Sequence, residues 1–168
     1  MKRLSYTILC LLVTVLAVAQ RGQYFPSDRF SSSLICDLCQ DKEGAVWVGT
    51  DYGLNRFDGY RFQTFLHDDA DTTSIGTNVV VTLLCDRDGR LWIGTNKGLD
   101  SYDAQRGTFR HYQFPDGVRP RVSSLLHRKD GSLLVGTAGY GAFTLSASDA
   151  QLQTYSQNGS DGYYSRLY

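Results

Sequence analysis

Short apolar runs separated by glycine-containing turns follow one another along most of this chain. Val79–Cys85 is a dense apolar run, and the segments at 91–95, 99–102 and 108–112 are short, rich in β-branched and aromatic residues, and divided by Asp, Asn and Gly. Runs of this length between such turn residues are typical of β-strands. The pattern therefore predicts a unit of four short strands.

The same unit occurs three times. The first unit is predicted to have strands at Leu34–Gln40, Val46–Thr50, Leu54–Phe57 and Arg61–Phe65. The second has them at Val79–Cys85, Leu91–Thr95, Leu99–Tyr102 and Thr108–Tyr112. The third has them at Val122–His127, Leu133–Thr137, Ala142–Leu145 and Leu152–Tyr155. A period of about 40–45 residues with several strands per unit is typical of β-propellers, so we predict an all-β fold of three four-stranded antiparallel blades, an incomplete propeller.

Residues that recur in the units have structural uses. Trp47 and Trp92 are expected to lie wedged between neighbouring blades, where Leu134 takes the same place in the third unit. The mid-strand glycines allow close approach of another side chain or backbone. The acids Asp41 and Asp86 are predicted to cap the amides of the first turn. The repeat is therefore scaffold, and none of its residues is a reactive group.

The first 19 residues are predicted to be a secretory signal peptide. Lys2 and Arg3 precede an apolar run, and Ala17-Val18-Ala19 is a small-residue cleavage site before Gln20. The alternative is a membrane anchor, but the run is shorter than the roughly 20 residues that a spanning helix needs. We therefore expect export to the periplasm.

Charge and cysteine content exclude several kinds of function. Without residues 1–19 the chain has 15 basic and 17 acidic residues, and no basic patch suggests contact with nucleic acid. The pair Cys36 and Cys39 has no second pair or nearby His to complete a zinc site, so both are expected to be structural thiols. The three His residues are scattered without metal spacing or a catalytic neighbour, and we expect no catalytic residue, no metal and no cofactor.

Two stretches carry a resemblance to a known family. Asp41–Thr50 and Asp86–Thr95, with the trailing segments Gly53–Gly59 and Gly98–Asp103 and the connection His67–Ile75, resemble the two-component regulator propeller repeat. The resemblance implies the sensor region of a hybrid histidine kinase that detects carbohydrate and signals to a phosphorelay controlling transcription. It also implies further blades and a kinase as partners, a homodimer and an inner-membrane anchor in the full-length protein.

The chain divides into six predicted segments. They are a signal peptide (1–19), a lead-in strand (20–32), three blades (33–77, 78–120 and 121–156) and a link with the start of a truncated fourth blade (157–168). Three blades cannot close a ring, so we expect either a fragment of a longer sensor or a truncated gene product.

One rim of the blades is the predicted location of a ligand or partner surface. Strand directions place the second turn of each blade on the same rim as the links between blades. Loops on such a rim are free to vary while the blades hold them, and aromatic, amide and charged groups there suit sugars. The candidate ligand-binding residues are Tyr52, Asn96, Lys97 and Tyr140. The alternative is that these are solvated turns.

Two other functions remain open. The chain could be a stand-alone secreted interaction protein, or a propeller-scaffold polysaccharide lyase or glycosidase. The second requires two carboxylates facing across a cleft, whereas the repeated acids fall at turns with structural uses.

Overall fold

The computed structural model describes residues 29–146 and 151–155, which form three antiparallel sheets. The first sheet contains β1 (Ile35–Gln40), β2 (Val46–Thr50), β3 (Gly53–Phe57) and β4 (Phe62–Phe65). The second contains β5 (Val80–Cys85), β6 (Leu91–Thr95), β7 (Gly98–Asp103) and β8 (Thr108–Tyr112). The third contains β9 (Val122–His127), β10 (Leu133–Thr137), β11 (Gly141–Leu145) and β12 (Gln153–Thr154). A short 3₁₀ turn, η2 (Pro115–Gly117), lies between the second and third sheets.

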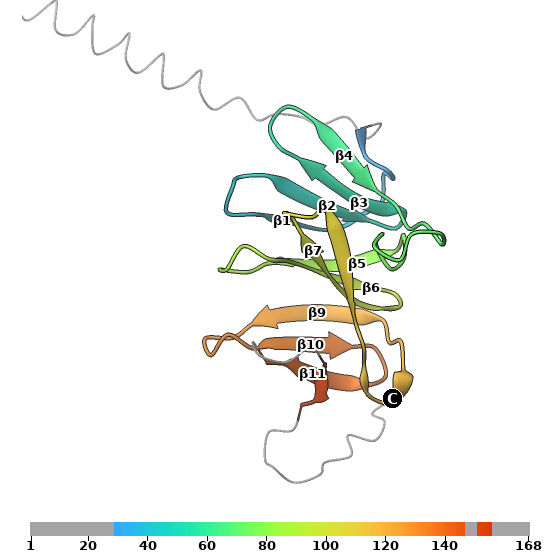
Figure 1. The fold of residues 1–168 in the computed structure, drawn as a ribbon, viewed down its shortest axis with the longest axis vertical. Coiled ribbons are helices and arrows are strands. Elements are labelled where there is room, and N and C mark those ends of the chain that lie inside the picture. Colours follow the sequence, from blue (N-terminus) through green and yellow to red (C-terminus); the bar gives the residue numbers. More distant parts are fainter. Residues whose placement is uncertain (1–28, 147–150, 156–168) are drawn as a thin grey trace, which may run out of the picture.

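The sheets are stacked as propeller blades are (Figure 1). Within each sheet the strands follow chain order, and every pair is antiparallel. The first strands of successive sheets are neighbours, because β1 contacts β5 and β5 contacts β9. This confirms the predicted fold class, and every predicted strand agrees with the structure to within one residue at each end. We therefore call the sheets blades 1, 2 and 3.

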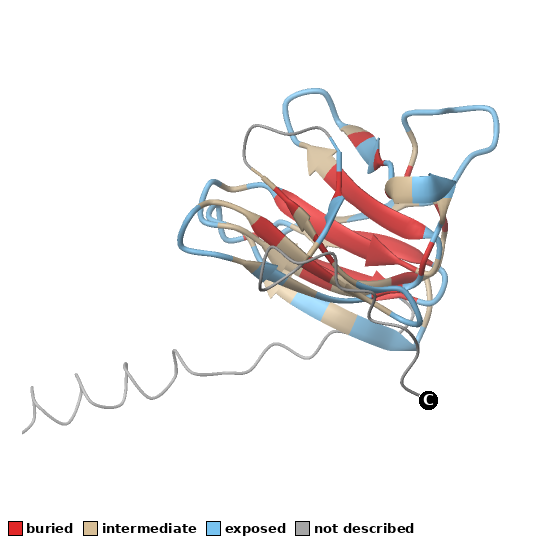
Figure 2. Ribbon diagram, turned by 90° about the horizontal axis from the view of Figure 1, so that it is seen from below, coloured by how far each residue is buried: buried red, intermediate tan, exposed pale blue. Residues whose placement is uncertain are grey.

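The hydrophobic core lies between the blades, where the middle strands are buried (Figure 2). Trp47 of blade 1 is 2% exposed, and its ring centroid lies 5.0 Å from that of Tyr102 in blade 2. Trp92 of blade 2 packs in one cluster with Leu133 and Phe143 of blade 3. Both tryptophans are therefore inter-blade wedges, as predicted, and burial of a side chain of this size stabilises the stack by about 1.5–3 kcal/mol.

Each wedge is fixed at its polar end by the predicted capping acid. The Asp41 Oδ1 atom accepts hydrogen bonds from the backbone N–H groups of Glu43 and Ala45, at 3.0 and 2.9 Å, and Oδ2 accepts one from the Trp47 indole N–H at 2.9 Å. Asp86 makes the same set of contacts in blade 2. The turn cap was predicted, whereas the bond to the indole was not.

The mid-strand glycines permit the close stacking of blades. A Cβ atom at Gly94 would lie 2.6 Å from Thr82 Cγ2 and 2.7 Å from Val122 Cγ1, which is nearer than carbon atoms pack. Gly49 faces Val80 of the next blade in the same way. Only a residue without a side chain fits there, as the sequence predicted.

The cysteines differ from the prediction. Cys39 is not a free structural thiol, because it forms a disulfide with Cys85, 46 residues further on. The two residues lie on β1 and β5, so the bond ties blade 1 to blade 2. Cys36 is exposed and free. The sequence analysis weighed only the C-x-x-C pair, since adjacency of β1 and β5 is a property of the stacked fold.

Some predictions lie outside the described residues. These are the signal peptide, most of the lead-in strand and the beginning of a fourth blade. Within the described part of the chain, no helix has the length and apolar character that crossing a membrane requires.

Candidate functional site

A pocket of about 390 Å³ lies on the rim where the sequence predicted a binding surface. Its walls come from the two links between blades, residues 66–78 and 113–121, and its floor from the β6–β7 turn and the rim end of β8. The volume falls within the range of about 300–1,000 Å³ that is usual for small-molecule sites. The lining residues belong to blade 2 and to the chain segments that enter and leave it.

The first link is held in shape by its own side chains. Asp68 accepts a hydrogen bond from the Ala70 N–H at 2.9 Å, and Asp71 accepts bonds from the N–H and hydroxyl of Thr73 at 2.8 and 2.7 Å. The Thr73 donors hold the pKa of Asp71 below its usual value. These carboxylates therefore brace turns of an exposed link, and that link forms one wall of the pocket.

His67 joins the two ends of this link. Its backbone N–H donates to the Asn78 side-chain oxygen at 2.7 Å, and its Nδ1 atom lies 2.7 Å from the Ile75 carbonyl oxygen. A donor at Nδ1 leaves Nε2 as the acceptor in the neutral ring. Nε2 lies 3.1 Å from an oxygen of the fully exposed Asp69, which it contacts as a donor when the ring is protonated.

Asp100 is a buried carboxylate at the floor of the pocket. The residue is 4% exposed and lies on β7. One carboxylate oxygen accepts a hydrogen bond from the Gly76 N–H at 2.8 Å, and the other lies 2.7 Å from His111 Nδ1. A Cβ atom at Gly76 would lie 3.0 Å from that carboxylate, so the absence of a side chain lets the link approach. Hydrogen bonds of this kind offset the free-energy cost of burying the Asp100 carboxyl group.

His111 on β8 completes this contact between blade and link. Its Nε2 atom lies 3.1 Å from the Thr72 carbonyl oxygen, so the ring bridges Asp100 to the opposite side of the link. The hydrogen bond to Asp100 raises the pKa of His111 above its ordinary value of 6.5, although partial burial opposes this. When the ring is protonated, its two nitrogens donate to Asp100 and to the Thr72 carbonyl oxygen.

Blade 1 holds its incoming segment with the equivalent residue. Asn55 occupies the position of Asp100, since Val48 pairs with Asn55 as Ile93 pairs with Asp100. Its side chain accepts from the Ser31 N–H at 3.0 Å and donates to the Ser31 hydroxyl at 2.8 Å. A polar residue at a buried position of the third strand was the available signal, and the sequence analysis missed it.

The four predicted ligand-binding residues are not brought together. Lys97 lines the pocket, but Tyr52, Asn96 and Tyr140 do not. Tyr52 and Tyr140 lie exposed in the corresponding turns of blades 1 and 3. The Asn96 side-chain oxygen is buried and has no hydrogen-bond partner among the described residues. A ligand role for each residue stays a prediction, and only Lys97 adjoins the cavity.

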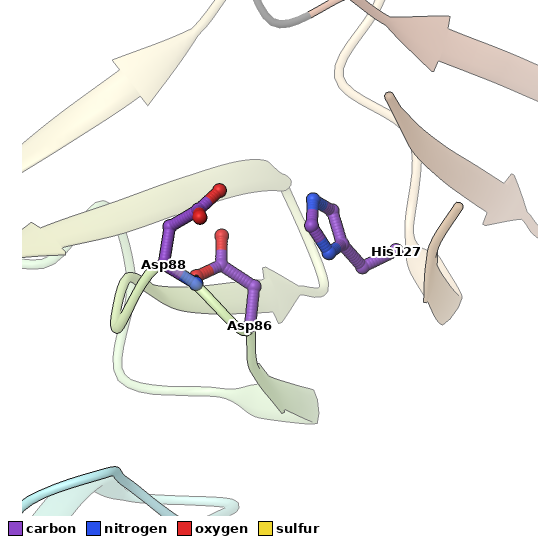
Figure 3. A group of neighbouring side chains, drawn as sticks. All are labelled: Asp86, Asp88 and His127. Atoms are coloured by element: carbon purple, nitrogen blue, oxygen red, sulfur yellow. The ribbon is translucent and has the colours of Figure 1, made fainter. Parts of the chain in front are cut away.

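A second group of polar side chains lies on the opposite rim. Asp86 and Asp88 project from the β5–β6 turn, and His127 faces them from the end of β9 (Figure 3). One potential ligand atom from each lies within 4.8 Å of the other two. This group joins two blades, so spacing along the sequence did not reveal it.

Two segments of the chain match a known family model. Residues 29–52 and 74–97 match the family model described as two component regulator propeller. Histidine kinase P4 of Formosa agariphila is 38% identical over 73 residues, a match that covers 39% of this chain and 5% of the kinase. The matched part is therefore a small share of that relative's length.

Solved structures share the fold. The extracellular domain of the putative hybrid two component system BT4673 from B. thetaiotaomicron has a TM-score of 0.63 and 21% identity, covering 80% of this chain and 17% of that one. Virginiamycin B lyase from Staphylococcus aureus, in a catalytically inactive H270A form with quinupristin, has a TM-score of 0.58 and 12% identity, covering 79% of this chain and 43% of the lyase. At these identities the likeness concerns the fold alone.

Proposed function

Because the chain carries two-component regulator propeller repeats, we propose that it is part of the periplasmic sensor region of a hybrid histidine kinase. In this proposal the blades bind a ligand, and the full-length protein signals to a phosphorelay that controls transcription. The matches to a histidine kinase and to the fold of an extracellular sensor domain support this reading. A homodimer, further blades and an inner-membrane anchor are part of the same proposal.

The pocket on the link rim is the observation that carries the proposal. It is built from chain segments that differ between blades, on a rigid stack of sheets, which is where binding residues are usually found. Its buried floor fixes the first link through Asp100 and His111. A ligand would therefore meet a shaped surface, with little ordering of the protein required.

The polar groups of the pocket favour a hydroxyl-rich ligand. The pocket lining combines acidic side chains from the first link with the cationic Lys97 and Arg119 and the amide of Gln113. Such a mixture offers both donors and acceptors with little excess of either charge. Sugar hydroxyls, which donate and accept, match this composition, so we propose an oligosaccharide as the ligand.

Binding, not catalysis, is the proposed role of the pocket. Both ring nitrogens of His111 contact oxygen atoms of the protein, and so do both nitrogens of His67. A histidine that acts as general base must present a free nitrogen to its substrate. The carboxylates of Asp68, Asp71 and Asp100 accept hydrogen bonds that hold the link in place. We therefore propose that the chain has no enzymatic activity of its own and is not a lyase or a glycosidase. A stand-alone secreted binding protein, the other alternative, would use the same pocket.

Calorimetric titration with a panel of defined oligosaccharides tests the proposal. We expect one member to bind with a Kd in the micromolar range and Lys97→Ala or Arg119→Ala to weaken it at least tenfold. Tyr60→Ala is the matched control, because Tyr60 is 94% exposed in the β3–β4 connection, outside the pocket. Equal binding by all three variants, or conversion of the glycan to products, would refute the proposed role.

A further inference from the structure

The group formed by Asp86, Asp88 and His127 has the donors of a metal site and lies away from the ligand pocket. Two carboxylates come from the turn that follows β5, and an imidazole comes from β9 in the next blade (Figure 3). The three ligand atoms lie within 4.8 Å of one another. Carboxylate oxygen and imidazole nitrogen together are typical ligands of Zn²⁺ and neighbouring divalent metals.

Asp86 is held in a fixed orientation with one acceptor position to spare. Its Oδ1 atom accepts from the N–H groups of Asp88 and Arg90, at 3.0 and 2.8 Å, and Oδ2 accepts from the Trp92 indole at 2.8 Å. Each carboxylate oxygen has two lone pairs, so Oδ2 retains one. Hydrogen bonds of this kind orient metal ligands in proteins and strengthen binding.

The other two side chains lack competing partners. No hydrogen bond to the His127 ring or to the Asp88 carboxylate exists in the part of the chain that the structure describes, although the His127 backbone is fixed by pairing with Leu133. Lys42 donates to the Asp88 carbonyl oxygen at 3.3 Å and so leaves the carboxylate free. Asp88 is exposed and can rotate.

We propose that Asp86, Asp88 and His127 bind a divalent transition metal, with Zn²⁺ as the reference ion. Three protein ligands and one water would complete the four-coordinate geometry that Zn²⁺ prefers. Ligand atoms of a tetrahedral zinc ion lie about 3.4 Å apart, and rotation of the exposed Asp88 side chain closes the difference. The ion would tie blade 2 to blade 3.

The junction between blades 1 and 2 lacks the histidine that completes the proposed ligand set between blades 2 and 3. Blade 1 has Asp41 and Glu43 in the same turn, but Cys85 occupies the position that corresponds to His127, since Cys85 pairs with Leu91 as His127 pairs with Leu133. Cys85 is engaged in the disulfide with Cys39. One junction is therefore closed by a disulfide, and the next has a metal-ligand set.

Titration of the metal-free full chain with ZnCl₂, followed by calorimetry and by thermal unfolding, tests the proposal. We expect one equivalent of zinc to bind and to raise Tm. His127→Gln and Asp88→Asn should each lower the affinity at least tenfold and abolish the Tm increase. Glu43→Gln, the matched change in the blade 1 turn, should change neither. Asp86 is left intact because its substitution would also open the turn.

The pocket histidine provides a second control. His67 lies beside Asp69, so His67→Gln measures zinc binding at the pocket. The proposal is overturned if the wild type binds no zinc, if His127→Gln and Asp88→Asn bind as the wild type does, or if only His67→Gln loses the ion. Circular dichroism of each variant before titration confirms that the change has not unfolded the chain.

Discussion

Replacing Asp100 by Ala should release the first link from blade 2. The substitution leaves the Gly76 N–H without its acceptor. Because Gly76 is only partly buried, the cost is about 1–2 kcal/mol, the lower part of the range for an unsatisfied buried group. The hydrogen bond to charged His111 adds about 1 kcal/mol, less than a buried pair would, because the ring is 41% exposed and water replaces part of the contact. We therefore expect the free energy of unfolding to fall by about 2–3 kcal/mol.

Thermal unfolding and amide hydrogen exchange measure this effect. For a domain of this size the loss corresponds to a fall in Tm of roughly 5–15 °C, and the Gly76 amide should lose its protection. Asp100→Asn should cost less, since Asn55 fills the equivalent position in blade 1. Asp51→Ala is the control, because Asp51 is an exposed acid on the same rim and its side chain has no hydrogen bond within the described residues.

The reasoning is refuted if Asp100→Ala unfolds at the same temperature as Asp51→Ala and exchange in residues 66–78 is unchanged. That result would mean that the link is held by its own turns and that the contact through Gly76 contributes nothing.

Three further outcomes follow from the structure. The pKa of His111 is raised in the folded chain, so the protonated ring stabilises the fold fully below pH 6.5, and this stabilisation is lost as pH rises through the folded-state pKa. His111→Gln should therefore reduce Tm more at pH 5.5 than at pH 9. Gly94→Val should destabilise by about 1–3 kcal/mol through overpacking against Thr82 and Val122, measured by urea unfolding. Gly107→Val, where an added side chain meets no atom within 4 Å but φ is 71°, should show the cost of backbone strain without the clash. Reducing the Cys39–Cys85 disulfide should lower the free energy of unfolding by up to about 4 kcal/mol, because the unfolded chain regains the entropy of a loop closed over 46 residues. Thermal unfolding with and without reductant measures this loss.

The strands and the wedges could be predicted from the sequence because their signals are local. Alternating apolar runs, turn glycines and the spacing from Trp47 to Trp92 all lie within one repeat or between identical positions of two repeats. Strand direction decides where turns and links meet, and Lys97 lies on the rim where the pocket is found. A role for Lys97 in binding stays a prediction.

The remaining contacts depend on pairs from different repeats or from link and blade. Asp100 meets Gly76 only because the link folds back over β7, and Cys85 meets Cys39 only because β5 stacks on β1. His127 faces Asp86 through the same stacking. A single sequence contains no signal for such pairs, because each partner is ordinary in its own local context.

The Asp-to-indole bond has a consequence for the order in which the stack opens. In blades 1 and 2 the aspartate that closes the first turn also accepts a hydrogen bond from the indole of the tryptophan packed against the next blade. Opening the turn therefore breaks the bond that holds the tryptophan. Blade 3 has Arg128 and Leu134 at these positions. Its turn is closed by backbone bonds like those of the other blades and by bonds from Ser132 to the Asp130 carboxylate, and neither set holds a wedge. Its outer strand, β12, has only two residues. Fraying should therefore begin at blade 3 and stop at the Trp92 junction, which makes that ring the boundary between a cooperative pair of blades and a looser third one.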